Sequence, residues 1–310
     1  MNASLSRAEL ILRTACGDRV KTGFPLAALT SFRIGGPAAL YLEPESETDL
    51  AAAGEAAMLG GIQVVVLGKG SNVLVSDEGF PGLVLRLGRG FRWVARDGDR
   101  LTTGGAMPLP ALAGVALRHA LSGIEFGVAI PASVGGAIRM NAGAHGREMA
   151  DVLERVHVYR LENGVSETLT PDAVGFAYRR TALSADAVVT GGVVRLAAGD
   201  PQAIRDRMDE AREWRRRTQP VAEPNCGSVF TNPPEDYAAR LIDTAGGKGV
   251  RVGGASVSAK HANFIVAEPG ASAADVAAVI SQIQSLVERT SGVRLEPEVR
   301  LIGAFDDARL

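Results

Sequence analysis

Apolar runs separated by Gly-rich breaks divide this chain into predicted helices and strands. Apolar residues recur at helical spacing in the segments 1–20, 47–59, 110–121, 201–219, 237–244 and 272–290, which we expect to be helices. Shorter apolar runs bounded by turn residues predict strands at 38–42, 63–67, 83–87, 91–95, 100–103, 152–161, 165–170, 187–196, 262–267 and 299–303. The order strand, helix, strand over 38–67 predicts a small parallel sheet, and the runs after residue 79 predict an antiparallel meander.

The segment Gln63–Val75 contains the turn around which we expect the chain to be organised. Its three consecutive Val residues predict a short strand that is buried on both faces, because no polar alternation marks a wet side. Gly68 and Gly70 then allow positive φ, so that several successive N–H groups can converge on one anion. Ser71 adds a hydroxyl and Asn72 an amide. This turn is therefore suited to holding a phosphate.

A second Gly-rich turn follows the predicted helix at 110–121. It has the sequence Ile130-Pro131-Ala132-Ser133-Val134-Gly135-Gly136-Ala137 and is followed by Asn141-Ala142-Gly143-Ala144. Two such turns predict a diphosphate held from two sides, although each alone is more often a tight connection. Neither matches G-x-G-x-x-G or G-x-x-x-x-G-K-[ST], which disfavours an ordinary Rossmann or P-loop interpretation.

Composition limits the class of protein. A length of 310 residues with 46% hydrophobic residues predicts two or three domains with packed cores. The net charge of −2 provides no overall attraction for nucleic acid or for an anionic membrane. Cys16 and Cys226 are too few for a thiolate metal site or a disulfide framework, and no apolar run is long enough to span a bilayer. We expect a cytoplasmic protein.

Several separated segments have the residues of one recurring pattern. Besides the two Gly-rich turns, these segments are Tyr178-Arg179, Gly227-Ser228-Val229-Phe230-Thr231-Asn232-Pro233, Lys260-His261-Ala262-Asn263-Phe264 and Leu295-Glu296-Pro297-Glu298-Val299-Arg300. Together they resemble the UDP-N-acetylenolpyruvoylglucosamine reductase family, in its shorter subtype. The resemblance extends over residues 24–303, with the motifs in the family's order.

The resemblance implies an α+β fold with α/β parts. An FAD-binding domain of the vanillyl-alcohol-oxidase (PCMH) type would occupy 1–198, in lobes of about 1–80 and 81–198, and a C-terminal α/β substrate-binding domain would occupy 199–310. The segment Arg33–Gly36 has no His of the kind that attaches FAD covalently in related oxidases, so non-covalent FAD is expected. The implied cofactor-binding residues are Gly68, Lys69, Gly70, Ser71, Asn72, Ser133, Gly135, Gly136, Asn141 and Gly143.

The implied activity is the NADPH-dependent reduction of UDP-N-acetylglucosamine enolpyruvate to UDP-N-acetylmuramate through FAD, in peptidoglycan synthesis. In the family pattern Ser228 donates a proton to the substrate carbon next to the one that takes the hydride. Arg179 would neutralise charge on the enolate oxygen, and a protonated Glu298 would donate a hydrogen bond to the same group. Asn232 and Lys248 match substrate-binding positions, with Lys248 facing the nucleotide diphosphate. We expect a monomer that binds neither nucleic acid nor membrane.

Two other interpretations stay open from the residues themselves. The chain could be another FAD-dependent oxidoreductase of the same fold, or a relative that binds FAD or a UDP-sugar without turnover. The sequence departs from the family pattern at Thr231, where Lys is usual, at Ala129 and Ala132, where Gly is usual, and at Ala259, where Glu is usual. These departures bear on substrate affinity and rate more than on the type of reaction.

Overall fold

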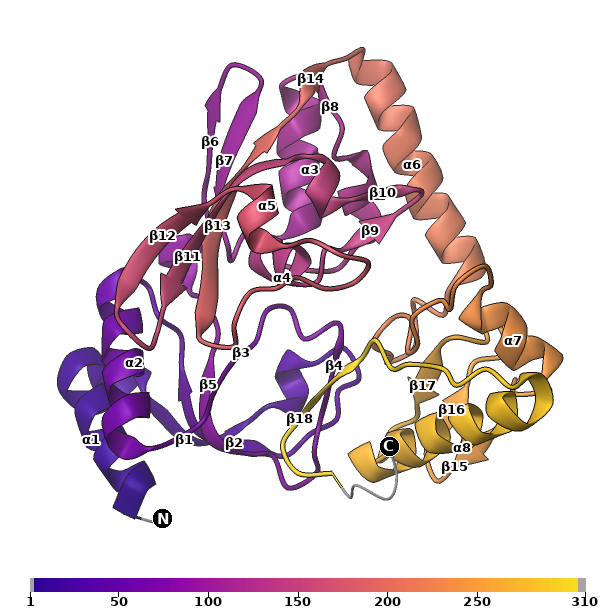
Figure 1. Cartoon of the computed structure of the whole chain (residues 1–310), viewed down its shortest axis with the longest axis horizontal. Coiled ribbons are helices and arrows are strands. Elements are labelled where there is room, and N and C mark those ends of the chain that lie inside the picture. The colour runs from indigo at the N-terminus through magenta and orange to yellow at the C-terminus, as the bar shows by residue number, and fades with distance from the viewer. Residues whose placement is uncertain (1–2, 306–310) are drawn as a thin grey trace. The chain divides into compact units, whose positions relative to one another are not determined.

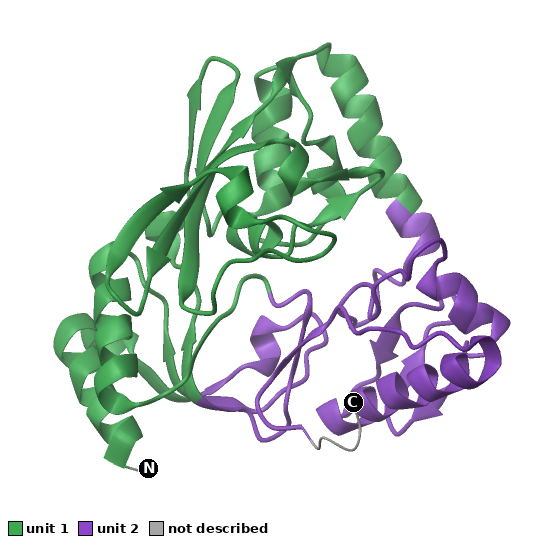
Figure 2. Cartoon of the chain, in the orientation of Figure 1, with its two compact units in different colours: residues 1–23, 39–69, 82–214 green, residues 24–38, 70–81, 215–310 purple. Residues whose placement is uncertain are grey.

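The structure is a computed structural model of the chain, and it describes residues 3–305 (Figure 1). The chain forms two compact units (Figure 2). Unit 1 contains residues 1–23, 39–69 and 82–214, and unit 2 contains residues 24–38, 70–81 and 215–310. The predicted division into domains at 198/199 stays a prediction. The compact units have other boundaries, because two short N-terminal segments belong to unit 2.

Unit 1 begins with two helices that pack against each other, α1 (Ala3–Cys16) and α2 (Glu47–Gly60). Ser46 caps α2 by accepting a hydrogen bond from the N–H of Asp49, and Gly61 ends the helix in the left-handed conformation. A side chain on Gly60 would lie 2.8 Å from the Cβ of Ala8, so the two helices approach closely at this glycine. Their buried faces meet the strands of a four-stranded sheet in one apolar core.

That sheet has the strand order β1-β2-β5-β3. Its strands are β1 (Lys21–Pro25), β2 (Pro37–Leu42), β3 (Val64–Val66) and β5 (Phe80–Leu85). β3 and β5 are parallel, with Val64 opposite Leu83. The two strands of the predicted unit over 38–67, β2 and β3, are not neighbours, because β5, which we expected in the antiparallel meander, lies between them. The prediction that β3 is buried on both faces is wrong. β3 is an edge strand and Val66 is 37% exposed.

A five-stranded antiparallel sheet with the order β12-β11-β13-β7-β6 forms the rest of unit 1. It confirms the predicted meander only for the antiparallel pair β6 and β7, because the first predicted strand of the meander is β5 of the other sheet. Its strands are β6 (Val94–Asp97), β7 (Arg100–Gly104), β11 (Leu153–Arg160), β12 (Val165–Leu169) and β13 (Ala187–Arg195). The helices of this part are α3 (Leu109–Arg118), α4 (Val134–Arg139), α5 (Pro171–Val174) and most of α6 (Pro201–Thr218). Two pairs of two-residue strands complete it, β8 (Leu121–Ser122) with β14 (Ala197–Ala198), and β9 (Gly143–Ala144) with β10 (Arg147–Glu148).

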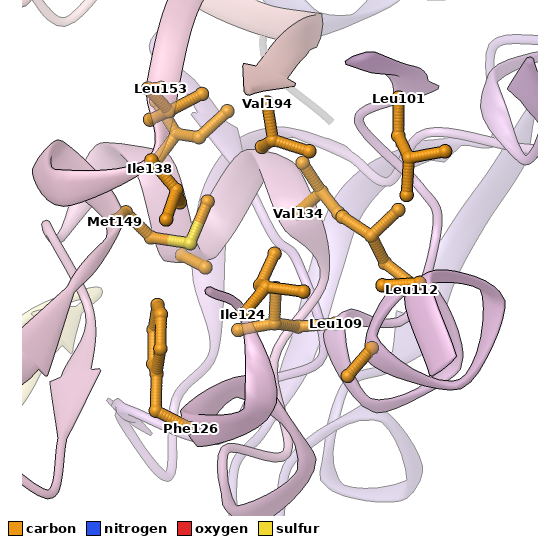
Figure 3. Packing of buried hydrophobic residues seen from close by; sticks show 14 of the residues in the cluster. Leu101, Leu109, Leu112, Ile124, Phe126, Val134, Ile138, Met149, Leu153 and Val194 are labelled. Atoms are coloured by element: carbon orange, nitrogen blue, oxygen red, sulfur yellow. The ribbon is translucent and has the colours of Figure 1, made fainter. Parts of the chain in front are cut away.

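The core of this part lies between the sheet and its helices (Figure 3). Leu109 of α3, Val134 of α4 and Leu101 of β7 are fully buried in it. The segment 134–139, which the sequence predicts to be a Gly-rich turn, is the short helix α4, and Ser133 is its N-cap. Six residues are too few for a helical period to be recognised, which is why the pattern did not predict this helix.

Unit 2 contains α7 (Ala238–Thr244) and α8 (Ala273–Ser291) with two small sheets. One sheet has the antiparallel strands β15 (Arg251–Val252), β16 (Ala255–Val257) and β17 (Ile265–Ala267). The other pairs β4 (Val73–Val75) in parallel with β18 (Arg300–Ile302). The buried face of α8 packs on these strands in the core of unit 2. No helix within residues 3–305 is long and apolar enough to cross a bilayer.

Candidate active site

The loop after β3 has a backbone that only glycine fits. Gly70 has φ 65°, and a Cβ on it would lie 2.0 Å from the carbonyl oxygen of Leu29. The N–H of Ser31 donates to the Gly70 carbonyl at 2.9 Å, so this close approach is held by a hydrogen bond. The predicted positive φ is therefore confirmed at Gly70, whereas Gly68 is not among the positive-φ glycines of the described chain.

The same loop presents hydrogen-bond donors that the protein does not use. Within residues 3–305 no oxygen accepts a hydrogen bond from the N–H groups of Gly68, Lys69, Gly70 or Ser71. Burial lowers the pKa of Lys69, and the positive charges of Arg86 and Arg92 lower it further. Unused N–H groups beside clustered cations are the chemistry that an anion such as a diphosphate requires. This loop therefore has the chemistry to hold an anion, and its contact with the diphosphate of FAD stays a prediction.

The second Gly-rich segment packs directly against the first. A Cβ on Gly68 would lie 2.7 Å from Oγ of Ser133. The N–H of Gly135 donates to the Gly105 carbonyl at 2.9 Å, and the N–H of Gly136 donates to Oγ of Ser133 at 3.3 Å. Both N–H groups are hydrogen-bonded within the protein. The observed role of this segment is therefore to pack against the first loop. Direct contact of Ser133, Gly135 and Gly136 with a cofactor stays a prediction.

Asn141 and Gly143 build the seat of Arg179. Asn141 is fully buried, with its side chain donating to the Ala177 carbonyl at 3.1 Å and accepting from the Ala150 N–H at 3.0 Å. The Arg179 guanidinium donates to the carbonyls of Asn141 at 3.4 Å and Gly143 at 2.9 Å. The roles of Asn141 and Gly143 in this structure are thus to hold the arginine. Their predicted contact with FAD is untested.

Arg179 is also fixed by its own backbone and by its neighbour. It adopts the left-handed conformation, with φ 57°, which is uncommon for a residue with a side chain. Its guanidinium carbon lies 5.0 Å from the centroid of the Tyr178 ring. A cation held in this way keeps a defined direction, as a residue that stabilises a developing negative charge must do.

Ser228 and Glu298 are brought together in unit 2, although 70 positions separate them in the sequence. Phe230 and Pro297 form an antiparallel bridge. The N–H of Glu298 donates to the Val229 carbonyl at 2.7 Å, and Thr231 donates to the Glu296 carbonyl at 2.9 Å. The segment after Ser228 and the segment that carries Glu298 are therefore adjacent and joined by backbone hydrogen bonds. Arg179 belongs to unit 1, and its meeting with these two residues stays a prediction.

The backbone of Glu298 is also hydrogen-bonded to Asn72, and the charge of Glu298 acts on the buried thiol of Cys226. The side-chain amide of Asn72 donates to the Glu298 carbonyl at 3.2 Å, and the Asn72 carbonyl accepts from Arg300 N–H at 3.0 Å. Cys226 is buried nearby in the same core. Its burial raises the pKa of the Cys226 thiol, and the negative charge of Glu298 raises it further. Asn72, predicted as a cofactor residue, therefore contacts the segment that carries Glu298.

The two predicted substrate residues make contacts within unit 2. Oδ1 of Asn232 accepts from the Ala238 N–H at 3.0 Å, at the start of α7. Lys248 forms a surface ion pair with Asp243 at 2.8 Å. Burial lowers the pKa of His261, and the positive charge of Lys248 lowers it further. Binding of substrate by Asn232 and Lys248 stays a prediction. Among residues 3–305 no cluster of His, Cys, Asp and Glu could hold a metal ion.

Comparison with known proteins decides the family. Residues 219–302 match the family model of the UDP-N-acetylenolpyruvoylglucosamine reductase C-terminal domain, and residues 38–169 match that of an FAD binding domain. The chain is 47% identical over 304 residues to UDP-N-acetylenolpyruvoylglucosamine reductase 2 of Symbiobacterium thermophilum, with 98% of each chain covered. The chain belongs to the UDP-N-acetylenolpyruvoylglucosamine reductase family. The reductase of Heliobacterium modesticaldum is 44% identical over 281 residues, which cover 90% of this chain and 89% of that protein.

Solved structures agree with this membership in the family. The crystal structure of the UDP-N-acetylenolpyruvylglucosamine reductase from Thermus caldophilus superposes with a TM-score of 0.81 at 37% identity, covering 92% of this chain and 99% of that one. A variant of Phl p 4 described as a glucose oxidase matches 63% of this chain with a TM-score of 0.51 at 13% identity, which is a likeness of fold alone. The predicted fold class, an FAD-binding fold with a C-terminal domain, is confirmed.

Two residues that hold the reductase-family motifs in place could not be assigned a role from the sequence. Asn263 lies in a segment that matches the family pattern, and Asn225 lies outside every matching segment. Both hydrogen-bond to the backbone around Ser228. An Asn in a strand-rich segment is a detectable signal, since Asn is depleted in strands. Its partner, however, is 33 positions away and is visible only in the fold.

Proposed function

We propose that this chain catalyses the NADPH-dependent reduction of UDP-N-acetylglucosamine enolpyruvate to UDP-N-acetylmuramate, a step of peptidoglycan synthesis. Membership in the family supports the reaction class. The single observation in the fold that carries the proposal is the backbone pairing of the segment after Ser228 with the segment that carries Glu298. In the overall reaction the carbon–carbon double bond gains one hydride, which NADPH supplies, and one proton, which comes from water through the protein.

FAD would be held at the loop Gly68–Ser71. Its diphosphate would accept hydrogen bonds from the unused N–H groups of that loop, and Lys69 would add a positive charge. FAD bound there would supply hydride transfer, from NADPH to the terminal carbon of the enolpyruvyl group. The segment Arg33–Gly36 contains no His, which supports non-covalent binding.

Ser228 would deliver the proton to the neighbouring carbon. A serine hydroxyl has a very high pKa, so it can act as an acid only when it is held close to a carbon that has become strongly basic. The Oγ–H bond breaks as the new C–H bond forms, and the resulting alkoxide then takes a proton from water through a relay. In residues 3–305 no side chain or carbonyl hydrogen-bonds to the Ser228 hydroxyl, so it is available for this task.

Arg179 and Glu298 would stabilise the charge that develops on the substrate carboxylate as the hydride arrives. A fixed guanidinium in a site without water can contribute several kcal/mol to such stabilisation. Glu298 in its protonated form would donate a hydrogen bond to the same group. Lys248 and Asn232 would bind the nucleotide part of the substrate, and we propose that the protein works as a cytoplasmic monomer.

Separate measurement of the two half-reactions tests this function. The Ser228→Ala variant should bind FAD and be reduced by NADPH at a rate within about twofold of the wild type. Its reoxidation by the enolpyruvyl nucleotide should fall about 10²- to 10⁴-fold, because the proton donor is gone. Ser285→Ala, which removes an exposed hydroxyl from α8, is the matched control and should leave both rates unchanged.

The same experiment separates the competing functions. Another FAD-dependent oxidoreductase would take up FAD but would not be reoxidised faster by the enolpyruvyl nucleotide in the wild type. A relative without activity would bind FAD or the nucleotide and would oxidise no NADPH. Normal reoxidation of Ser228→Ala would remove Ser228 from the mechanism while leaving the reaction itself in place.

A further inference from the structure

The backbone is fixed immediately before Ser228 by one asparagine. Oδ1 of Asn225 accepts a hydrogen bond from the N–H of Gly227 at 2.9 Å. The amide nitrogen of Asn225 donates to the carbonyls of Pro220 at 3.0 Å and Glu223 at 2.7 Å. The chain on the N-terminal side of the serine is therefore tied into a closed turn.

A second asparagine fixes the backbone immediately after Ser228. Oδ1 of Asn263 accepts from the N–H of Phe230 at 2.9 Å, while its amide nitrogen donates to the Phe230 carbonyl at 2.8 Å. The backbone carbonyl of Asn263 accepts from the N–H of Val229 at 2.9 Å. Asn263 is 4% exposed, so water does not compete for these bonds. Its side chain pairs with Phe230 as a neighbouring strand would.

The clamp formed by Asn263 rests on a rigid turn of its own. The N–H of Asn263 donates to Nδ1 of His261 at 3.3 Å, and the N–H of Phe264 donates to the His261 carbonyl at 3.0 Å. The His261 ring lies edge-on to the Phe264 ring, with their centroids 4.6 Å apart. Phe264 is buried, and its carbonyl accepts from the N–H of Ser258. Asn263 therefore cannot move without disturbing the core.

We propose that Asn263 is a positioning residue that sets the place of the Ser228 hydroxyl, an inference that rests on the proposed role of Ser228 as proton donor. The hydroxyl has no hydrogen bond of its own to any residue in 3–305, so only the backbone on either side determines where it points. Proton transfer to carbon depends steeply on distance, and a displacement of about 1 Å can cost about 10²-fold in rate.

An asparagine side chain is the one that fits this place. Phe230 presents a donor and an acceptor at once, and a primary amide offers an acceptor and a donor in one plane. Aspartate has no donor for the Phe230 carbonyl and would bring a charge into a buried place. Serine is too short to reach both groups, although it leaves space for a water molecule.

Two substitutions in the full-length, FAD-loaded protein test the proposal. Asn263→Ser and Asn263→Asp should leave flavin reduction by NADPH within about twofold of the wild type and slow reoxidation by the enolpyruvyl nucleotide by about 10- to 10²-fold. The solvent deuterium isotope effect on reoxidation should rise, because proton transfer becomes the slow step. KM for the nucleotide should change far less than kcat.

A matched control separates positioning from loss of stability. Ser272→Ala removes the N-cap of α8 in the same unit and lowers stability without touching the Ser228 segment. It should leave reoxidation and the isotope effect as in the wild type. Equal reoxidation rates in the Asn263 variants and the wild type would overturn the proposal. If the wild type itself is not reoxidised by the nucleotide, it is the proposed function that fails.

Amide hydrogen exchange in the wild-type protein gives a test that needs no variant. The N–H groups of Val229 and Phe230 should be protected, since Asn263 accepts a hydrogen bond from each. The N–H of Gly270, in an exposed turn, provides an unprotected reference. Exchange at Phe230 as fast as at Gly270 would contradict the clamp.

Discussion

Replacing Asp49 by Asn should loosen the attachment of the segment after α1 to α2, and its cost can be worked out from the structure. Asp49 is 6% exposed. Its two carboxylate oxygens accept hydrogen bonds from the Arg19 guanidinium at 2.6 and 2.7 Å, and Oδ2 also accepts from the N–H of Glu45 at 2.7 Å. Chiefly because of the Arg19 hydrogen bonds, the pKa of Asp49 falls from 3.8 to about 2.

That lowered pKa sets the size of the effect. The difference between a pKa of 3.8 and one of about 2 corresponds to about 2 kcal/mol of stability at neutral pH. The Arg19 side chain is 43% exposed, so solvent screens the pair and the figure is an upper bound. We expect Asp49→Asn to lower the free energy of unfolding by about 1 to 2 kcal/mol at pH 7.

Urea denaturation of the wild type and the variant at several pH values is the assay. Because the pKa is lowered in the folded state, the contribution of Asp49 is complete above pH 3.8 and is lost as the pH falls through about 2. The difference in the free energy of unfolding between the two proteins should therefore be constant near neutral pH and should decrease as the pH falls from 3.8 towards about 2. Glu9→Gln breaks the surface pair with Arg13 and serves as control, with a loss below about 0.5 kcal/mol. A difference in the free energy of unfolding that stays the same in acid would refute the stabilising role of the Asp49 carboxylate.

Two further predictions concern the loop at Gly70 and the helix α8. Gly70→Ala should lower both FAD affinity and the melting temperature much more than Gly61→Ala. The two glycines have φ of 65° and 61°, but only at position 70 would the new Cβ meet a backbone atom, the Leu29 carbonyl oxygen at 2.0 Å. Equal losses in the two variants would contradict this packing. Asp77→Ala should lower the free energy of unfolding by about 1 to 2 kcal/mol in urea denaturation, because its carboxylate accepts hydrogen bonds at 2.7 and 3.0 Å from the first two N–H groups of α8. Asp77→Asn, which keeps an acceptor, should lose less, and an Asp77→Ala variant as stable as the wild type would refute the cap.

The regular elements could be predicted where the local pattern was long enough to show its period. The helix predicted at 47–59 is α2, and the one predicted at 272–290 is α8, each bounded by a capping serine and a glycine. The burial of β3 was mispredicted, since a run of three Val residues gives no information on whether the strand is central or at an edge. That position depends on the strand order of the sheet, which local sequence does not encode.

The candidate site could be predicted in its parts but not in its assembly. The glycines of the first loop predict a close approach of backbone to backbone, which the structure has at Gly70 and Leu29, because no other residue takes that conformation without strain. The pairing of the Ser228 segment with the Glu298 segment joins distant parts of the chain, and only the fold shows that Asn263 and Asn72 hold these two segments. The hydrogen bonds of the Gly135 and Gly136 N–H groups could likewise not be predicted from the sequence, because their acceptors are brought close by the folding of the chain.

The most direct test of the proposed reaction is the oxidation of NADPH by the purified, FAD-loaded protein with and without UDP-N-acetylglucosamine enolpyruvate. We expect oxidation that depends on the nucleotide, with one NADPH consumed for each UDP-N-acetylmuramate formed. NADPH oxidation at the same rate with and without the nucleotide, or a protein that takes up no FAD, would contradict the account.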